Sequence, residues 1–332
     1  MTGLRKPELL RTIADAVVDS GWNISYLSGL QSHPFQLQIY NNDESYQLRV
    51  YIWTLTHGGG QARPADEYRI QITGVDRIQV ALGERTLVLG WWESRGVFAR
   101  FDARRHSGRL GRSPSIQIRE SCLREADTSG FSPCDKGNQE IAIAFRPDFF
   151  VEYVKNLETL HDFGRSPDAF AVLSSLPQEP VINDQAIQTL DSIRKTTVVS
   201  VSRKLRDNSF RQRVLTAYSH RCAVCGLQLK LVDAAHIVPV TYAASTDETR
   251  NGLALCALHH RAYDQALVAV DDKYSILVNE AQLDEIKALK LAEGIDRFKR
   301  GLLPTILLPP AISDRPHVEY IKTANRIRGW SD

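Results

Sequence analysis

Three cysteines and one histidine in the second half of this chain have the spacing of metal ligands. Cys222 and Cys225 form a C-x-x-C pair, and Cys256 and His259 form a C-x-x-H pair. A tight turn can present both thiolates of the first pair to one ion, and the second pair supplies the other half of a tetrahedron. A redox C-x-x-C would leave Cys256 and His259 without a role. We therefore predict a structural zinc site of the Cys3His type.

A second set of side chains in the same stretch could hold a divalent cation and move a proton. His236 lies in the β-rich run LVDAAHIVPV, Asn251 opens a turn, and a helix predicted from about Cys256 carries His260 and Asp264 at positions i and i+4. That spacing puts the last two on one helical face, where they can bind one cation. A lone strand histidine is usually a core residue, and a His–Asp pair is often only a surface pair. Whether these residues are catalytic or structural therefore depends on their order along the chain.

That order resembles the HNH nuclease family. A C-x-x-C pair is followed by a strand histidine, an asparagine, and C-x-x-H-H with an aspartate one turn later. The segments AAHIVP, NGLALC and HHRAYD are similar to the branch of predicted restriction endonucleases that have an N-terminal DNA-recognition domain. The resemblance covers about residues 211 to 275. It implies a ββα-metal fold and metal-dependent cleavage of DNA.

The resemblance also implies a role for each member of the second set. His236 would be the general base that takes a proton from the attacking water. Asn251 would hold the adjacent loop and orient that histidine. His260 and Asp264 would bind the catalytic Mg²⁺ or Mn²⁺, which stabilises charge on the scissile phosphate and the leaving oxygen.

One position departs from the family's pattern. Many family members have a metal ligand directly before the general base, where this chain has Ala235. Successive side chains on a strand alternate between its faces, so Asp233 would share a face with Ala235. Asp233 is therefore a candidate substitute ligand, acting directly or through water.

The first half of the chain has a different pattern of apolar residues, which predicts one helix followed by several short strands. Residues 4 to 20 have apolar side chains at helical spacing. Strands are expected over residues 35–40, 46–55, 67–73, 85–89, 96–102 and 140–145, and a helix from about 148 to 160. Cys122 and Cys134 lie in a polar stretch that we interpret as a loop, and we treat both as ordinary cysteines rather than metal ligands. The fold class is α+β, with a mostly β N-terminal domain and flanking helices linked to a zinc-containing ββα-metal domain.

The segment from residue 91 to residue 119 combines arginines with aromatic side chains. Guanidinium groups bind phosphates and base edges, and aromatic rings can stack on an unstacked base, so this mixture is typical of a nucleic-acid surface. A solvated basic face with core aromatics is the alternative. The candidate DNA contacts are Trp91, Trp92, Arg95, Arg100, Arg104, Arg105, His106, Arg109 and Arg112.

Composition shifts divide the chain into parts. Residues 164–184 are rich in proline and serine and read as a linker, which a helix extends to residue 195. We expect a DNA-recognition domain over residues 1–163, a linker and connecting helix over 164–195, and a nuclease domain with a C-terminal extension over 196–332. Residues 194 to 213 collect basic side chains, which could track a phosphate backbone or form a solvated helix.

Composition and charge bound the remaining possibilities. The net charge of +2 is too small to name a partner. No apolar run is long enough to cross a bilayer, and the odd number of cysteines argues against a disulfide framework, so a cytoplasmic protein in a reducing compartment is expected, with no membrane partner.

The combined expectation is a restriction-type endonuclease that cuts foreign or modified double-stranded DNA in antiviral defence. A homodimer is possible, because duplex cleavage needs two active sites or two visits by one. Two alternatives remain open. The zinc module could be a non-catalytic DNA-binding finger, or the first domain could sense a small ligand that activates a phage-defence nuclease.

Overall fold

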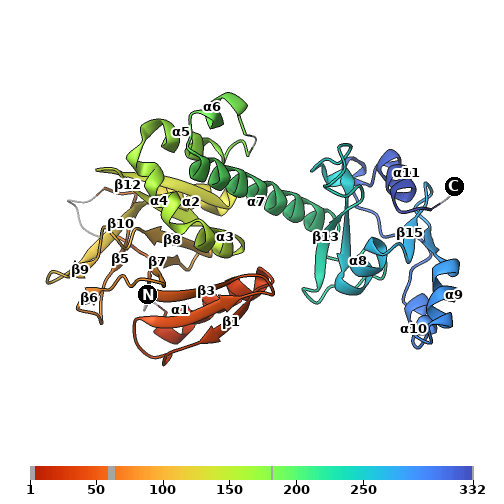
Figure 1. The fold of residues 1–332 in the computed structure, drawn as a ribbon, viewed down its shortest axis with the longest axis horizontal. Helices are drawn as coiled ribbons and strands as arrows, with labels where there is room; N and C mark the ends of the chain where they lie inside the picture. Colours follow the sequence, from red (N-terminus) through yellow and green to blue (C-terminus); the bar gives the residue numbers. More distant parts are fainter. Residues whose placement is uncertain (1–3, 59–63, 181, 331–332) are drawn as a thin grey trace. The chain divides into compact units, whose positions relative to one another are not determined.

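The chain forms two compact units in the computed structural model, which describes residues 4–58, 64–180 and 182–330. The first unit is Met1–Leu205 and the second is Arg206–Asp332 (Figure 1). The sequence prediction had placed the start of the nuclease domain at residue 196, ten residues before this boundary.

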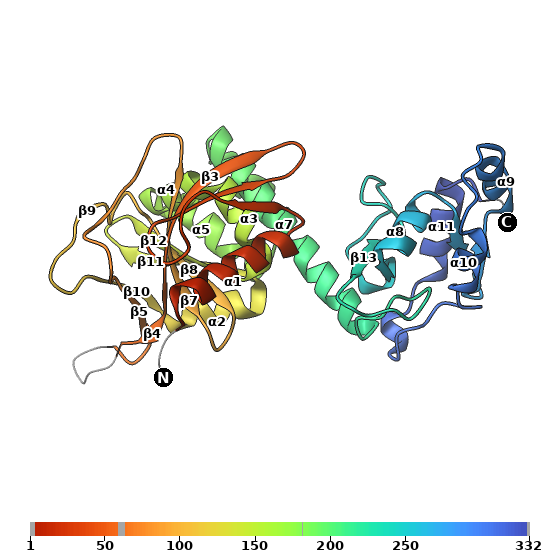
Figure 2. The same ribbon diagram turned by 90° about the horizontal axis from the view of Figure 1, so that it is seen from below.

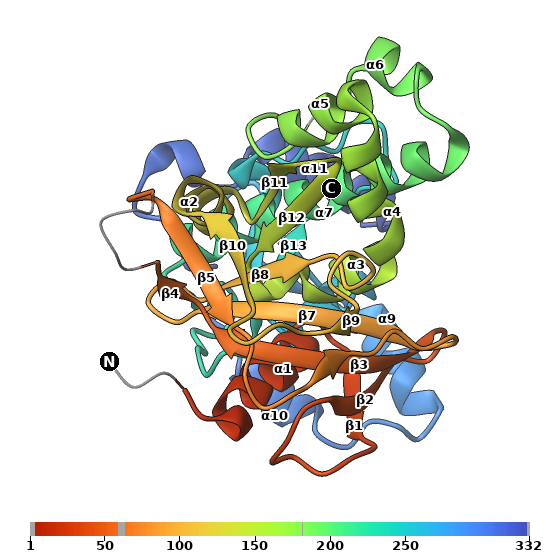
Figure 3. The ribbon, with the colours of Figure 1, turned by 90° about the vertical axis from the view of Figure 1, so that its left-hand side faces the viewer.

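A mixed seven-stranded sheet forms the centre of the first unit, in the order β1-β2-β3-β7-β8-β12-β11. Strands β3 and β7 pair in parallel, whereas β2 and β3 pair antiparallel. These three strands are neighbours in the sheet (Figure 3). The strands are β1 (Asn23–Tyr26), β2 (Phe35–Tyr40), β3 (Ser45–Thr54), β7 (Arg85–Trp92), β8 (Val97–Phe101), β11 (Phe131–Gly137) and β12 (Glu140–Phe145). A small sheet has the order β10-β5-β4, with β10 (Ser115–Arg119), β5 (Glu67–Gln71) and β4 (Thr56–His57), while β6 (Arg77–Ile78) pairs with β9 (Gly108–Arg109).

The large sheet is buried on both faces, because its strands carry apolar side chains at successive positions. In β3, Leu48, Val50 and Ile52 face one hydrophobic core, and Tyr51 and Trp53 face another. This arrangement follows from the two-residue period of a strand. Continuous apolar runs are typical of strands that are covered on both sides.

Helices cover one face of this sheet, and a helix with the small sheet covers the other. The first core includes residues of α1 (Lys6–Asp19), α3 (Phe150–Lys155), α4 (Leu157–Asp162) and α5 (Pro167–Ser175). Figure 2 labels these four helices. The second core includes Leu123 and Ala126 of α2 (Glu120–Ser129).

Two sequence expectations for this unit are wrong. The predicted linker contains α5, whose Ala169 and Leu173 are buried in the first core, so apolar spacing outweighs the proline and serine content there. The predicted loop around Cys122 and Cys134 is instead α2 followed by β11. The two cysteines form a disulfide that joins these elements.

Helix α7 (Ser192–Ala217) contributes to both units. Val198, Val201 and Leu205 belong to the core of the first unit, and Phe210 and Val214 belong to the core of the second. The sequence had indicated separate helical pieces over this stretch, whereas the structure has one continuous helix after the short α6 (Asp184–Gln188).

A β-hairpin and a helix form the centre of the second unit. Strand β13 (Val232–His236) pairs antiparallel with β14 (Gly252–Cys256), and α8 (Ala257–Asp264) packs against both. The C-terminal extension packs on this ββα unit, since Ile306, Ile321 and Ala324 are buried in the same core. Its elements are β15 (Val268–Val270), β16 (Ile276–Val278), α9 (Glu280–Ala288), α10 (Ile295–Arg300) and α11 (Val318–Ile327). Within the ranges described above, no helix has both the length and the apolar character needed to cross a membrane.

Candidate functional site

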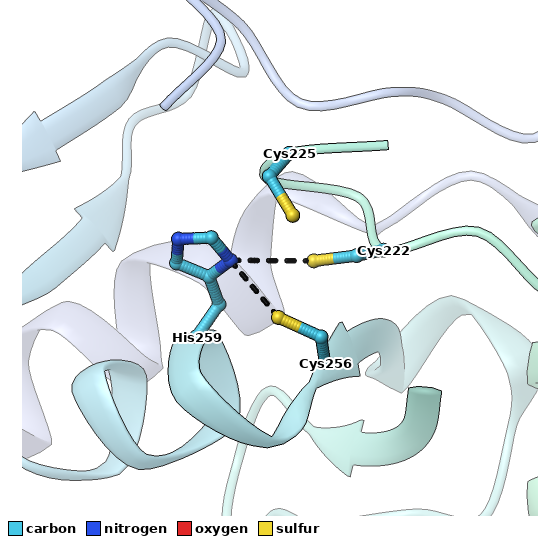
Figure 4. Close-up of side chains that lie close together, drawn as sticks. All are labelled: Cys222, Cys225, Cys256 and His259. Carbon is cyan, nitrogen blue, oxygen red and sulfur yellow. Dashed lines mark hydrogen bonds between the residues drawn. The ribbon is translucent and has the colours of Figure 1, made fainter. Parts of the chain in front are cut away.

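The four predicted zinc ligands lie together in the second unit. Cys222 and Cys225 are on the loop before β13, Cys256 ends β14, and His259 is in the first turn of α8 (Figure 4). Their ligand atoms all lie within 4.8 Å of one another. Cys222 Sγ is 3.6 Å and Cys256 Sγ is 3.2 Å from His259 Nδ1. The Cys3His group predicted from the spacing is confirmed.

The local backbone explains how the first pair converges. Gly226 adopts a left-handed conformation with φ of 76°, directly after Cys225. Its N–H donates to the carbonyl of Cys222, and the N–H of Cys222 donates to the carbonyl of Leu227. Glycine adopts positive φ without steric cost, so the chain can turn back after two thiols and present both to one point.

The chemistry of this donor set fits zinc. Tetrahedral zinc, at about 2.3 Å from sulfur and about 2.0–2.1 Å from nitrogen, places neighbouring ligand atoms roughly 3.5–3.8 Å apart. Burial raises the pKa of Cys225 to about 12 and also raises that of Cys256. At Cys222 burial is opposed by hydrogen bonds from His259 and backbone amides, which lower the pKa to about 6. Three adjacent thiolates need a cation to offset this burial, and a Zn²⁺ ion would supply that charge.

His236 is held at the end of β13 by contacts on its face and its edge. Its ring stacks on Phe210, with 3.7 Å between centroids and 11° between planes. Its Nε2 lies 3.2 Å from Asp247 Oδ1, and the side chain remains 15% exposed. The ring is therefore fixed in orientation and still reachable from solvent.

Asn251 is fully buried and joins the strand to the loop that follows it. Its Oδ1 accepts from the N–H of Val238 at 2.9 Å. Its Nδ2 donates to the carbonyl of Thr246 at 2.8 Å and to Ser245 Oγ at 3.2 Å. These bonds stabilise the loop between β13 and β14, which agrees with the loop-holding role that the resemblance implies.

Gly252 lets α7 approach the hairpin closely, and this gives a first prediction. A Cβ at this position would overlap Val214 and come within 3.0 Å of Phe210 Cζ. We expect Gly252→Ala to destabilise the second unit by about 1–3 kcal/mol, because the packed helix and strand must separate. Urea unfolding measures the change in the free energy of unfolding. Gly29→Ala is the control, since a Cβ at Gly29 meets no atom within 4 Å. Equal stability of the two variants would contradict the packing argument.

His260 and Asp264 lie one turn apart on α8, as predicted. His260 Nε2 is 3.7 Å from Asp264 Oδ2, and the side chains are 32% and 52% exposed. Two donors on an exposed face fit Mg²⁺ or Mn²⁺, because hard cations keep several waters and bind substrate phosphates beside one or two protein groups. His259, by contrast, is buried at the zinc ligands.

Asp233 has a different partner. Its Oδ1 is 2.6 Å from Arg211 Nε, in an exposed ion pair. Within the described part of the chain, the Cys3His group is the only set of three or more His, Cys, Asp or Glu donors close enough to hold one ion. Direct ligation by Asp233 beside His260 and Asp264 therefore has no support in this geometry.

The structure separates the candidate DNA contacts of the first unit. Trp91 and Trp92 are core residues on opposite faces of the sheet, and Arg100 is fully buried, so the prediction that these three contact DNA is wrong for this fold. Arg100 donates to the carbonyls of Phe101 and Thr86.

The other candidates of this segment lie nearer the surface. Three of them are paired with acids: Arg95 with Asp127, Arg104 with Asp102 and Asp162, and His106 with Glu140. Arg105, Arg109 and Arg112 are exposed. Among the described residues none of these three guanidinium groups is paired with an acid, and Arg105 Nη2 donates to the carbonyl of Gln139.

Two neighbours of His236 were not predicted. Asp247 lies in the polar loop STDETR, where nothing in the sequence distinguishes it from the adjacent Glu248. Phe210 has a usable signal, since it stands four residues before Val214 on one helical face.

Comparison with known proteins divides the chain in the same way. Residues 222–271 match the HNH endonuclease family, and residues 46–154 match the family described as methylase-associated X1. No curated protein matches the chain. A solved structure named "Modification dependent TagI restriction endonuclease" is 12% identical, with 85% of this chain and 81% of that chain covered and a TM-score of 0.28.

The match to the HNH endonuclease family covers His236, Asn251, His260, Asp264 and all four zinc ligands. The chain thus carries a C-terminal HNH endonuclease domain, preceded by a methylase-associated X1 domain.

Proposed function

We propose that this protein is a metal-dependent DNA endonuclease of the restriction type, which hydrolyses phosphodiester bonds in foreign or modified double-stranded DNA. The observation that carries the proposal is His236, fixed between Phe210 and Asp247 at the end of β13, within the segment that matches the HNH endonuclease family. A histidine kept in one orientation and reachable by water suits a general base.

The chain's own residues would divide the reaction among them. His236 takes the proton of the attacking water, while Asn251 keeps the adjacent loop in place. His260 and Asp264 would hold Mg²⁺ or Mn²⁺, which when bound stabilises charge on the phosphate and the leaving oxygen. The zinc ligands tie the loop that carries Cys222 and Cys225 to the junction of β14 and α8, and so support the hairpin and the helix that carry these groups.

Charged side chains near His236 would contact the DNA backbone. Arg206 and Arg211 lie on α7 and are about half exposed, at 48% and 54%. Both face aspartates, so a phosphate would compete for a guanidinium that is already paired. We assign recognition of the modification to the first unit, with Arg105, Arg109 and Arg112 as its candidate phosphate contacts. A homodimer would bring two active sites to one duplex.

A cleavage assay on matched DNAs tests the proposal. The substrates share one sequence and are unmodified, base-methylated, hydroxymethylated or phosphorothioated. The zinc-loaded protein is assayed with Mg²⁺, with Mn²⁺, and with neither ion added, which avoids a chelator that would also remove zinc. We expect cutting only with added metal, and faster cutting of one modified DNA than of the unmodified one.

The outcomes separate the parts of the proposal. Equal cutting of all four DNAs would refute recognition of modified DNA and leave the nuclease standing. Absence of cutting on every DNA, together with tight binding to them, would support the non-catalytic zinc DNA-binding protein instead. Cutting without an added small ligand would count against a ligand-activated enzyme.

A further inference from the structure

Asp247 contacts His236 and two arginines of α7, Arg206 and Arg213. Its Oδ1 is 3.2 Å from His236 Nε2, and its Oδ2 is 3.8 Å from Arg206 Nη1. Its backbone carbonyl accepts from Arg213 Nη2 at 2.5 Å. One carboxylate oxygen of Asp247 thus faces His236, and the other faces the guanidinium group of Arg206.

The preceding residue is anchored independently. The carbonyl of Thr246 accepts from Asn251 Nδ2, and Thr246 Oγ1 lies 2.8 Å from the hydroxyl of Tyr320. Asn251 is completely buried, so this anchor is rigid. The loop is therefore held at Thr246, whose carbonyl binds Asn251, and at Asp247 itself, whose carbonyl binds Arg213.

We propose that Asp247 is a positioning residue for His236, which sets the tautomer in which Nε2 carries the hydrogen and Nδ1 accepts the proton of water. This proposal rests on the proposed nuclease function. An ionised carboxylate can only accept hydrogen bonds, so the neutral imidazole beside it must donate from Nε2. Nδ1 then keeps its lone pair, and no described residue forms a hydrogen bond to it.

This geometry makes Asp247 a partner of the base rather than a ligand of the catalytic ion. The described residues include no group in which Asp247 lies close enough to His260 and Asp264 to share one ion with them. Its two carboxylate oxygens already face His236 and Arg206. The acid next to the base thus comes from the loop before β14, whereas the strand position before His236 is occupied by Ala235.

Asp247→Asn tests the proposal, with Glu248→Gln as the matched control at the adjacent carboxylate. Asparagine has nearly the same shape, but its amide can donate to Nε2 and so favour the opposite tautomer. We expect kcat to fall roughly 100-fold or more, as when the aspartate of a Ser-His-Asp triad becomes asparagine, with KM for DNA little changed. Asp247→Glu should restore part of the rate, and Glu248→Gln should cut like the wild type.

Side-chain ¹⁵N chemical shifts of His236 supply a readout that does not depend on activity. At a pH where the imidazole is neutral, we expect the Nε2–H tautomer in the wild type and in Glu248→Gln, and a shift toward Nδ1–H in Asp247→Asn. An unchanged tautomer, or a rate for Asp247→Asn within about threefold of a cutting wild type, would overturn the positioning role. If the wild type cuts none of the four DNAs, the proposed nuclease function itself fails, and the shifts still report whether Asp247 sets the tautomer.

Discussion

Replacement of Cys256 by serine is expected to unfold the second unit and leave the first unit folded. The Cys3His group joins the loop before β13, the end of β14 and the start of α8, which surround a single core. Structural zinc contributes apparent binding free energies of about 10–16 kcal/mol. An ordinary domain is stable by only about 5–15 kcal/mol, so loss of the ion is enough to unfold this one.

Calorimetry and zinc content check this expectation together. The wild type should show two thermal transitions and release one zinc per chain, whereas Cys256→Ser should release none and keep only the transition of the first unit. Cys122→Ser is the control, because it removes a cysteine in the first unit and should leave the zinc in place. Two intact transitions in Cys256→Ser would mean that hydrophobic packing alone stabilises the second unit.

The zinc ligands could be predicted from sequence because their spacing expresses local geometry. C-x-x-C and C-x-x-H each describe one turn, and the turn brings both ligands to one point whatever the rest of the chain does. The elements expected for His236, Asn251, His260 and Asp264 are likewise present: His236 ends β13, Asn251 directly precedes β14, and α8 carries His260 and Asp264. These features need few long-range contacts to be recognised.

The misassigned residues of the first unit show what local patterns leave out. Arg100 and Phe98 have the same parity in β8, so both point to the face that the helices cover. A count of arginines and aromatic residues cannot show that face, because it depends on α3, whose residues come about fifty positions later in the chain. The disulfide between Cys122 and Cys134 has the same cause, since it requires α2 to lie along β11.

Asp247 could not have been predicted for a related reason. It approaches His236 because Asn251 and Arg213 fix the path of a polar loop, and that path is not encoded in any repeating spacing. Loops take their conformation from the groups that satisfy their backbone hydrogen bonds. Prediction of this contact would require the partners of Thr246 and Asp247 to be known first.

Replacement of His236 by alanine should slow cutting strongly while the second unit stays folded. A positioned general base contributes about 10²–10⁴-fold to a rate, so kcat should fall by that factor, and DNA binding should be unchanged. The side chain is only partly buried, and its loss leaves Phe210 and Val214 in the core. Zinc content and the thermal transitions should therefore equal those of the wild type.

Added imidazole distinguishes a missing base from a damaged fold. The space left between the ring of Phe210 and the carboxylate of Asp247 has the shape of an imidazole, so the free base should restore part of the rate to His236→Ala. It should restore less to His236→Ala combined with Asp247→Asn, because the carboxylate that orients it is then absent. A wild-type rate for His236→Ala would make His236 a structural residue of β13 and would require another group to take the proton from water.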